Sequence, residues 1–146
     1  MVTMKKILCA VDFSDISPKV AEYAKTLAQA FDGDVVALYV APALTQYVGF
    51  HIPAGSIESF VGEIVSGAEK TMDVFVEENF ENITAKGVVC TGDAAEEIVN
   101  FAQKEGVDII VMGTHGRKGI DRLLFGSVAE KVVKTSKIPV LTVRPD

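Results

Sequence analysis

Short apolar runs alternate along the chain with longer segments whose apolar residues recur every three or four positions. The runs have strand length and the longer segments have helical period. Such alternation is typical of strand–helix units built around a parallel sheet. The predicted strands are Ile7–Val11, Val35–Val40, one within Ile83–Cys90, Asp108–Met112 and Val140–Val143. Because Val35–Val40 has no polar position, we expect that strand to be buried on both faces.

The segments between these runs predict four helices. Ser17 is a suitable cap for the first helix, with Pro18 in its first turn and Gly33 at its end. The others are expected from Ile57 to near Phe80, from a cap at Asp93 to about Lys104, and over Ser127–Thr135. Residues Ala41–Gly55 contain two prolines and two glycines without a clean period, so we expect a surface loop there.

The 146 residues are enough for one domain, and we find neither a repeat nor a linker. We expect an α/β fold, a doubly wound five-stranded parallel sheet in the order 3-2-1-4-5 with helices on both faces. Helices cover both faces only if the chain reverses its direction across the sheet once, and ligands bind at that reversal. The order places Asp12–Ser17 opposite Gly113–Ser127 at this point.

The segment Gly113–Ser127 is unusually rich in glycine and carries local positive charge. Its glycines are Gly113, Gly116, Gly119 and Gly126, and its basic residues are Arg117, Lys118 and Arg122. Glycine lets backbone N–H groups approach a ligand, and the helix start at Ser127–Val128 adds further donors. The Ser127 hydroxyl can donate as well. These features together predict a phosphate site, although each alone has an ordinary structural explanation as a flexible loop, a cap or a solvated turn.

Three other polar residues have open roles. Asp12 can accept hydrogen bonds from a ribose hydroxyl or an adenine amino group, or it can cap a local turn with Ser14. His115 either contacts phosphate or is simply exposed. His51 has no ligand partner at metal spacing, and we assign it no role.

Charge and cysteine content narrow the class of function. The formal net charge of −6 argues against general nucleic-acid binding. No apolar run approaches the ~20 residues of a membrane span, and Met1–Lys6 does not resemble a signal peptide. Cys9 and Cys90 lie in apolar runs and form no CxxC motif, which favours a reducing cytoplasm.

These residues resemble the universal stress protein family (UspA-like) in its ATP-binding branch, over essentially the whole chain. The family signature is two glycines separated by two residues, then nine residues, then Gly-Ser or Gly-Thr. Gly113, Gly116, Gly126 and Ser127 meet this spacing. The opening Val11-Asp12-Phe13-Ser14 and the closing Ile138–Val143 are similar to the first turn and last strand of the family.

The resemblance implies an adenine nucleotide alpha hydrolase-like fold that binds ATP. The sequence leaves open whether magnesium or manganese accompanies the nucleotide. It implies that Asp12 and Val40 lie near the adenosine, with Met112 and Gly113 beneath it. Around the phosphates it implies Gly116, Gly126, Ser127 and Val128, and His115 completes the candidate set. It also implies a homodimer through Val140–Val143, an apolar edge strand that would otherwise offer unpaired backbone. The expected partners are an adenine nucleotide and a second copy, with no nucleic acid and no membrane.

The leading hypothesis is a regulatory module that binds ATP without efficient turnover. The chain has no GxxxxGK motif, no GxGxxG after the first strand and no acidic cluster placed for two metals. A slow ATPase or nucleotide hydrolase, in which Asp12 or His115 orients water, is an alternative. A non-nucleotide interaction dimer with a vestigial glycine loop is another.

Overall fold

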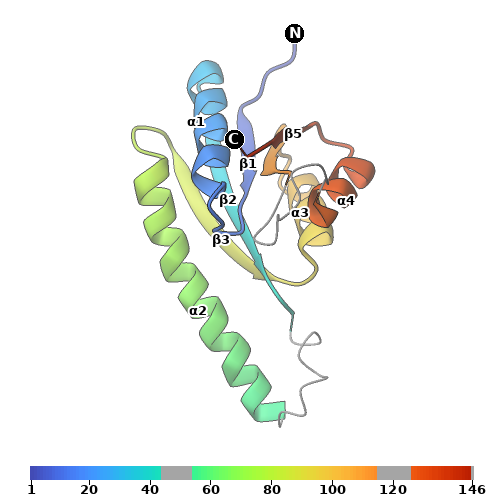
Figure 1. Cartoon of the computed structure of the whole chain (residues 1–146). Helices are drawn as coiled ribbons and strands as arrows, with labels where there is room; N and C mark the ends of the chain where they lie inside the picture. The colour runs from blue at the N-terminus through green and yellow to red at the C-terminus, as the bar shows by residue number, and fades with distance from the viewer. Residues whose placement is uncertain (44–53, 115–125, 146) are drawn as a thin grey trace.

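Strands and helices alternate along the part of the chain that the structure describes, which is residues 1–43, 54–114 and 126–145 of a computed structural model (Figure 1). The elements are β1 (Lys6–Ala10), α1 (Ser17–Phe31), β2 (Asp34–Ala41), α2 (Ala54–Asn79), β3 (Ala85–Thr91), α3 (Ala94–Lys104), β4 (Ile109–Gly113), α4 (Ser127–Thr135) and β5 (Val140–Val143). The type and order of every described element match the sequence prediction.

The five strands form one parallel sheet in the order β3-β2-β1-β4-β5. Cys9 of the central strand lies opposite Ala37 of β2 on one side and Val111 of β4 on the other. The chain therefore moves outward from β1 to β3 and then crosses to β4, which confirms the predicted order and the predicted reversal between β1 and β4.

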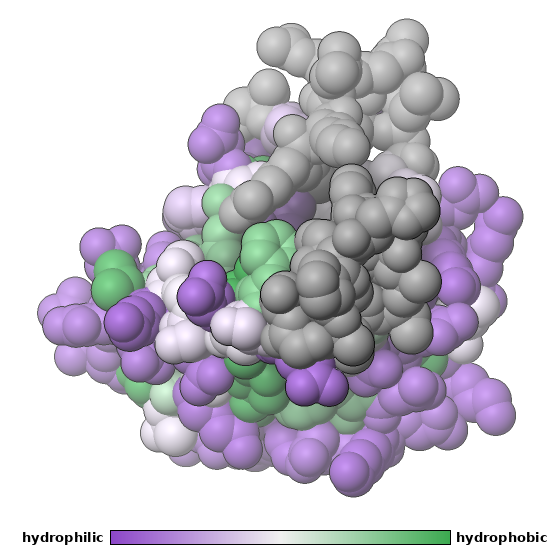
Figure 2. All heavy atoms as spheres, turned by 90° about the horizontal axis from the view of Figure 1, so that it is seen from below, coloured by the Kyte–Doolittle hydropathy of each residue, from purple (hydrophilic) through white to green (hydrophobic). Residues whose placement is uncertain are grey.

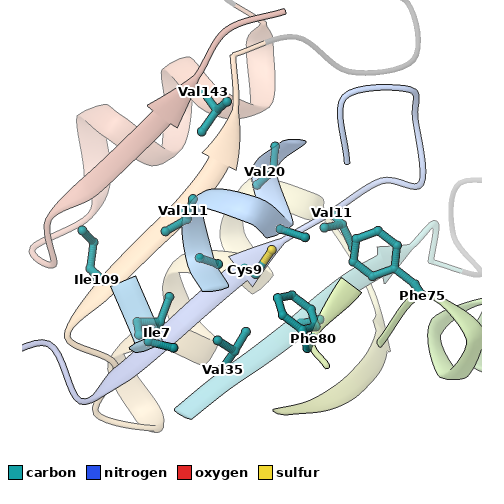
Figure 3. Packing of buried hydrophobic residues seen from close by; sticks show 14 of the residues in the cluster. Ile7, Cys9, Val11, Val20, Val35, Phe75, Phe80, Ile109, Val111 and Val143 are labelled. Atoms are coloured by element: carbon teal, nitrogen blue, oxygen red, sulfur yellow. The ribbon is translucent and has the colours of Figure 1, made fainter. Parts of the chain in front are cut away.

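Each face of the sheet is covered by two helices. Successive side chains of a strand point to opposite faces, so Ile7 and Cys9 of β1 pack with α1 and α2, as Figure 3 shows. Leu8 and Ala10 point the other way and pack with α3 and α4. This arrangement confirms the doubly wound α/β fold with helices on both faces.

The start of α1 differs from the prediction. The N-cap is Ile16, whose side chain makes no capping hydrogen bond, and Ser17 is the first helical residue. The Ser17 hydroxyl donates instead to Oδ1 of Asp12 at 3.3 Å. Ser17 as the cap was therefore wrong, because the Asp12 carboxylate offers its hydroxyl a nearby charged acceptor.

At the end of α1, Asp32 rather than Gly33 adopts the left-handed conformation, with φ of 52°. Gly33 serves a different purpose. A Cβ atom there would lie 2.6 Å from the backbone oxygen of Lys5, so glycine lets the chain pass close to β1 as it enters β2.

The second helix begins at Ala54, and β2 extends through Ala41. The predicted loop Ala41–Gly55 is therefore too long at both ends, and residues 44–53 lie outside the described part. Ala54 and Gly55 add no large apolar residue to the helical pattern, so periodicity could not place the start. The first turns of α2 extend past the sheet in Figure 1, and none of residues 58–71 is buried.

The last two helices begin as predicted. Oδ2 of Asp93 accepts the backbone N–H of Glu96 at 3.1 Å, which confirms the cap of α3. Gly106, with φ of 66°, follows the end of α3. The observed α4 has the predicted bounds, and Gly126 is its N-cap. No helix in the described ranges has the length and apolar content needed to cross a membrane.

Candidate functional site

A cavity of about 500 Å³ lies at the carboxyl ends of β1, β2 and β4, where the chain reverses across the sheet. Figure 2 views the molecule from below the orientation of Figure 1 and shows apolar atoms gathered in the middle of a mostly hydrophilic face. The lining residues are Ala10, Val11, Asp12, Ile16, Ser17, Val20, Leu38, Tyr39, Val40, Pro42, Ala94, Ile98, Met112, Gly113, Ser127 and Val128. The cavity is thus mainly apolar, with a few polar groups in its wall.

The structure brings most of the predicted site residues together. Six of them line the cavity: Asp12, Val40, Met112, Gly113, Ser127 and Val128. Gly126 does not line it but directly precedes two residues that do. His115 and Gly116 lie outside the described residues, as do the basic residues Arg117, Lys118 and Arg122.

Both ends of the glycine-rich segment are tied together beside the cavity. The backbone N–H of Gly126 donates to the carbonyl of Thr114 at 2.6 Å. The backbone N–H of Thr114 in turn donates to the carbonyl of Val143 at 2.9 Å. The end of β4 and the start of α4 are therefore held at the same place, next to β5.

The amino end of α4 is well suited to bind an anion. Its N-cap, Gly126, has no side chain to satisfy the first backbone N–H groups, and Ser127 is exposed. Unsatisfied N–H groups at a helix start carry about half a positive charge in total. Since Ser127 and Val128 line the cavity, this charge lies at its wall. Ser127 is not the cap, so capping alone does not explain its presence.

Asp12 is oriented by the turn that follows β1. Its Oδ1 accepts the backbone N–H of Ser14 at 2.9 Å and the hydroxyl of Ser17 at 3.3 Å. The local turn that the sequence allowed is therefore present. Asp12 lines the cavity, and both bonds come from the turn on one side of it. They hold the carboxylate at the cavity wall.

Sequence reasoning missed part of the wall. Ala94 and Ile98 of α3 line the cavity on the side of β2, and Tyr39 and Pro42 extend the β2 wall on either side of Val40. Ala94 and Ile98 follow the ordinary helical pattern of core residues, so nothing in their spacing distinguishes a ligand wall from a core. Their position beside the reversal point emerges only from the fold.

The cysteines lie outside the site. Burial raises the pKa of the Cys9 thiol to about 12. Burial, and to a lesser degree the negative charge of Glu97, raises the pKa of Cys90. Neither thiol lines the cavity, and both stay protonated at neutral pH. Within the described ranges, no three His, Cys, Asp or Glu side chains come together to hold a metal ion.

Comparison with known families decides the assignment. Residues 3–144 match the family model described as the universal stress protein family. The chain belongs to the universal stress protein family. Universal stress protein MJ0531 of Methanocaldococcus jannaschii is 37% identical to it over 96% of this chain and 82% of that protein.

Solved universal stress proteins share the fold. The structure of MJ0577, from the same archaeon, matches with a TM-score of 0.86 and 30% identity over 99% of both chains. A universal stress protein in complex with cAMP has a TM-score of 0.64 at 19% identity, covering 99% of both chains. One from Archaeoglobus fulgidus in complex with dAMP has a TM-score of 0.60 at 23% identity, covering 97% of this chain and 98% of that one. At such identities the last two show the fold alone.

Proposed function

We propose that this universal stress protein is a regulatory module that binds an adenine nucleotide, ATP in particular, in the cavity at the β1/β4 reversal. The observation that carries the proposal is the meeting, around one apolar cavity, of the uncapped amino end of α4 and the carboxylate of Asp12. The existence of family members in complex with cAMP and with dAMP supports it.

In this proposal the two ends of the nucleotide meet different walls. The adenosine packs on the apolar surface of Val40 and Met112, and its ribose hydroxyls donate to Asp12. The phosphates lie at the amino end of α4, against the backbone N–H groups of Ser127 and Val128 and the Ser127 hydroxyl. Gly113 lies beneath the adenosine with Met112, and Gly116, Gly126 and His115 complete the proposed phosphate loop. A size of about 500 Å³ falls within the usual range of small-molecule sites.

We propose binding with little or no turnover. Among the described residues that line the cavity, Asp12 is the single carboxylate, and the turn already engages its Oδ1. A magnesium or manganese ion would be held chiefly by the phosphates and water. Hydrolysis is tested by incubating the protein with ATP and magnesium and following ADP and AMP by chromatography.

The direct test is to identify what the protein carries. The purified protein is denatured and the supernatant analysed by mass spectrometry, and the emptied protein is titrated with ATP and magnesium by calorimetry. We expect a copurified adenine nucleotide and a measurable heat of binding. Absence of both would overturn the proposal.

A matched pair of glycine variants locates the site. Gly126 has φ of −60°, which any residue adopts, so Gly126→Val adds no backbone strain while its branched side chain crowds the proposed phosphates. We expect at least about a tenfold loss of ATP affinity. Gly62→Val on the open surface of α2 is the control and should bind ATP as the wild type does.

We also propose a homodimer through β5 and a cytoplasmic location. β5 is an edge strand of the sheet, so one side of its backbone has no partner strand within the described chain. Both cysteines are free, which suits a reducing compartment.

A further inference from the structure

A second hollow, of about 430 Å³, lies between the start of α1 and the last turns of α2. Its apolar surface comes from Phe13, Phe75 and Val74, and Val74 is 51% exposed. Lys70 and Glu78 lie four residues before and after Val74, so the three side chains share one face of α2. The hollow therefore has an apolar centre, a cation at one end and a carboxylate at the other.

The turn that forms one wall of this hollow is strained. Phe13 has φ of 61°, a conformation that bulky residues rarely adopt. The Oγ of Ser14 is buried and has no hydrogen-bond partner within the described part of the chain. Each feature costs free energy, and backbone strain of this kind is found mainly at binding and catalytic sites.

The same turn is also a wall of the nucleotide cavity. Ser17 lines both hollows. The Phe13 ring lies 4.7 Å from the ring of Tyr39, which lines the nucleotide cavity, and 5.9 Å from Phe75, which lines the second hollow. Because Ser14 and Ser17 hold the Asp12 carboxylate, a displacement of either serine changes the orientation of Asp12.

We propose that the second hollow binds a small amphipathic monoanion, and that its occupancy is coupled to nucleotide binding through the turn Asp12–Ser17. The ligand's apolar body covers Phe13 and Val74, and its negative group lies near Lys70 and the start of α1, whose first turn has no acidic residue. Glu78 at the far end repels a second negative charge, which favours a monoanion over a polyphosphate. Only the coupling rests on the proposed nucleotide function.

Titration with anilinonaphthalenesulfonate, an aromatic monoanion, tests both parts in the full-length protein. We expect it to shift the amide NMR signals of residues 13–17 and 70–78, with and without saturating ATP. Lys70→Gln should weaken its binding about threefold, the effect of one exposed charge. Lys104→Gln, which removes an exposed lysine from the last turn of α3, should not change it.

Coupling predicts a reciprocal effect measurable by calorimetry. ATP should change the dissociation constant of the probe by the same factor as the probe changes that of ATP. The second site would be overturned if ATP displaced the probe competitively or if the probe shifted only NMR signals elsewhere in the chain. Equal effects of the two lysine variants on probe binding would overturn it too. If neither ligand changed the dissociation constant of the other, the coupling would be overturned. If ATP does not bind at all, the nucleotide proposal fails while the titration with the probe alone still decides the second site.

Discussion

Asp12 combines a structural role with its proposed role in binding, and two substitutions separate them. Asp12→Ala removes the acceptor of both turn hydrogen bonds, so we expect the free energy of unfolding to fall by about 1–2 kcal/mol. Asp12→Asn keeps an acceptor oxygen and should cost less than half of that. Its neutral oxygen binds ribose hydroxyls more weakly, so ATP affinity should fall about tenfold. Calorimetry measures the ATP affinity and urea unfolding measures the free energy of unfolding. Wild-type ATP affinity in the Asn variant would show that Asp12 stabilises the turn but does not bind the nucleotide.

At the scale of elements, the packing of α2 on β3 depends on the absence of one side chain. A Cβ atom at Gly87 would lie against the buried Met72, with Sδ at 3.0 Å, and 3.2 Å from Val76. We expect Gly87→Ala to lower the free energy of unfolding by about 1–3 kcal/mol through overpacking. Gly62→Ala, where the added atom meets open space on α2, should raise it by about 0.5–1 kcal/mol. Urea unfolding of both variants checks that the two changes in the free energy of unfolding have opposite signs. If Gly87→Ala left the free energy of unfolding unchanged, α2 would be able to shift outward freely.

The cap of α3 predicts a pH dependence. The backbone N–H of Glu96, and secondarily the ammonium of Lys131, hold the pKa of Asp93 below its ordinary value. An acid with a lowered folded pKa stabilises the fold above its ordinary pKa of about 3.9, and this contribution is lost as the pH falls through the lowered value. Asp93→Ala should therefore cost about 1 kcal/mol at pH 7. Unfolding curves of the variant and the wild type should converge in acid. Asp73→Ala, an exposed change on α2, controls for the loss of negative charge, and a difference that persists at low pH would contradict the capping role.

The sequence predicted the strands and helices better than it predicted the residues at which they begin and end. Periodicity identified every described strand and helix, because burial on one or two faces sets the spacing of apolar residues. It failed where a local contact decides the conformation: Ser17 bonds to Asp12 instead of capping α1, and Asp32 rather than Gly33 takes the left-handed turn.

For the molecule as a whole, the order of the sheet was enough to place the candidate site at the reversal. It could not show that Ala94 and Ile98 close the far wall, since their spacing is that of core residues. Nor could it show that Asp12 and Phe13 belong to a turn between two hollows. Both facts depend on contacts between segments far apart in the chain.

Assembly through β5 can be tested at a single backbone atom. The carbonyls of Pro139 and Val143 accept the N–H groups of Ile110 in β4 and of Thr114 just after it, so by alternation the backbone of Thr142 faces the open edge. Thr142→Pro removes one outward N–H without removing a bond to β4, and proline is tolerated on edge strands. We expect light scattering after gel filtration to show a dimer for the wild type and for Thr142→Val, which keeps the N–H, but a monomer for Thr142→Pro. A monomeric wild type, or a proline variant that stays dimeric, would place the interface elsewhere or remove it. Because a paired β5 also steadies Thr114 and hence the start of α4, the proline variant should bind ATP more weakly as well.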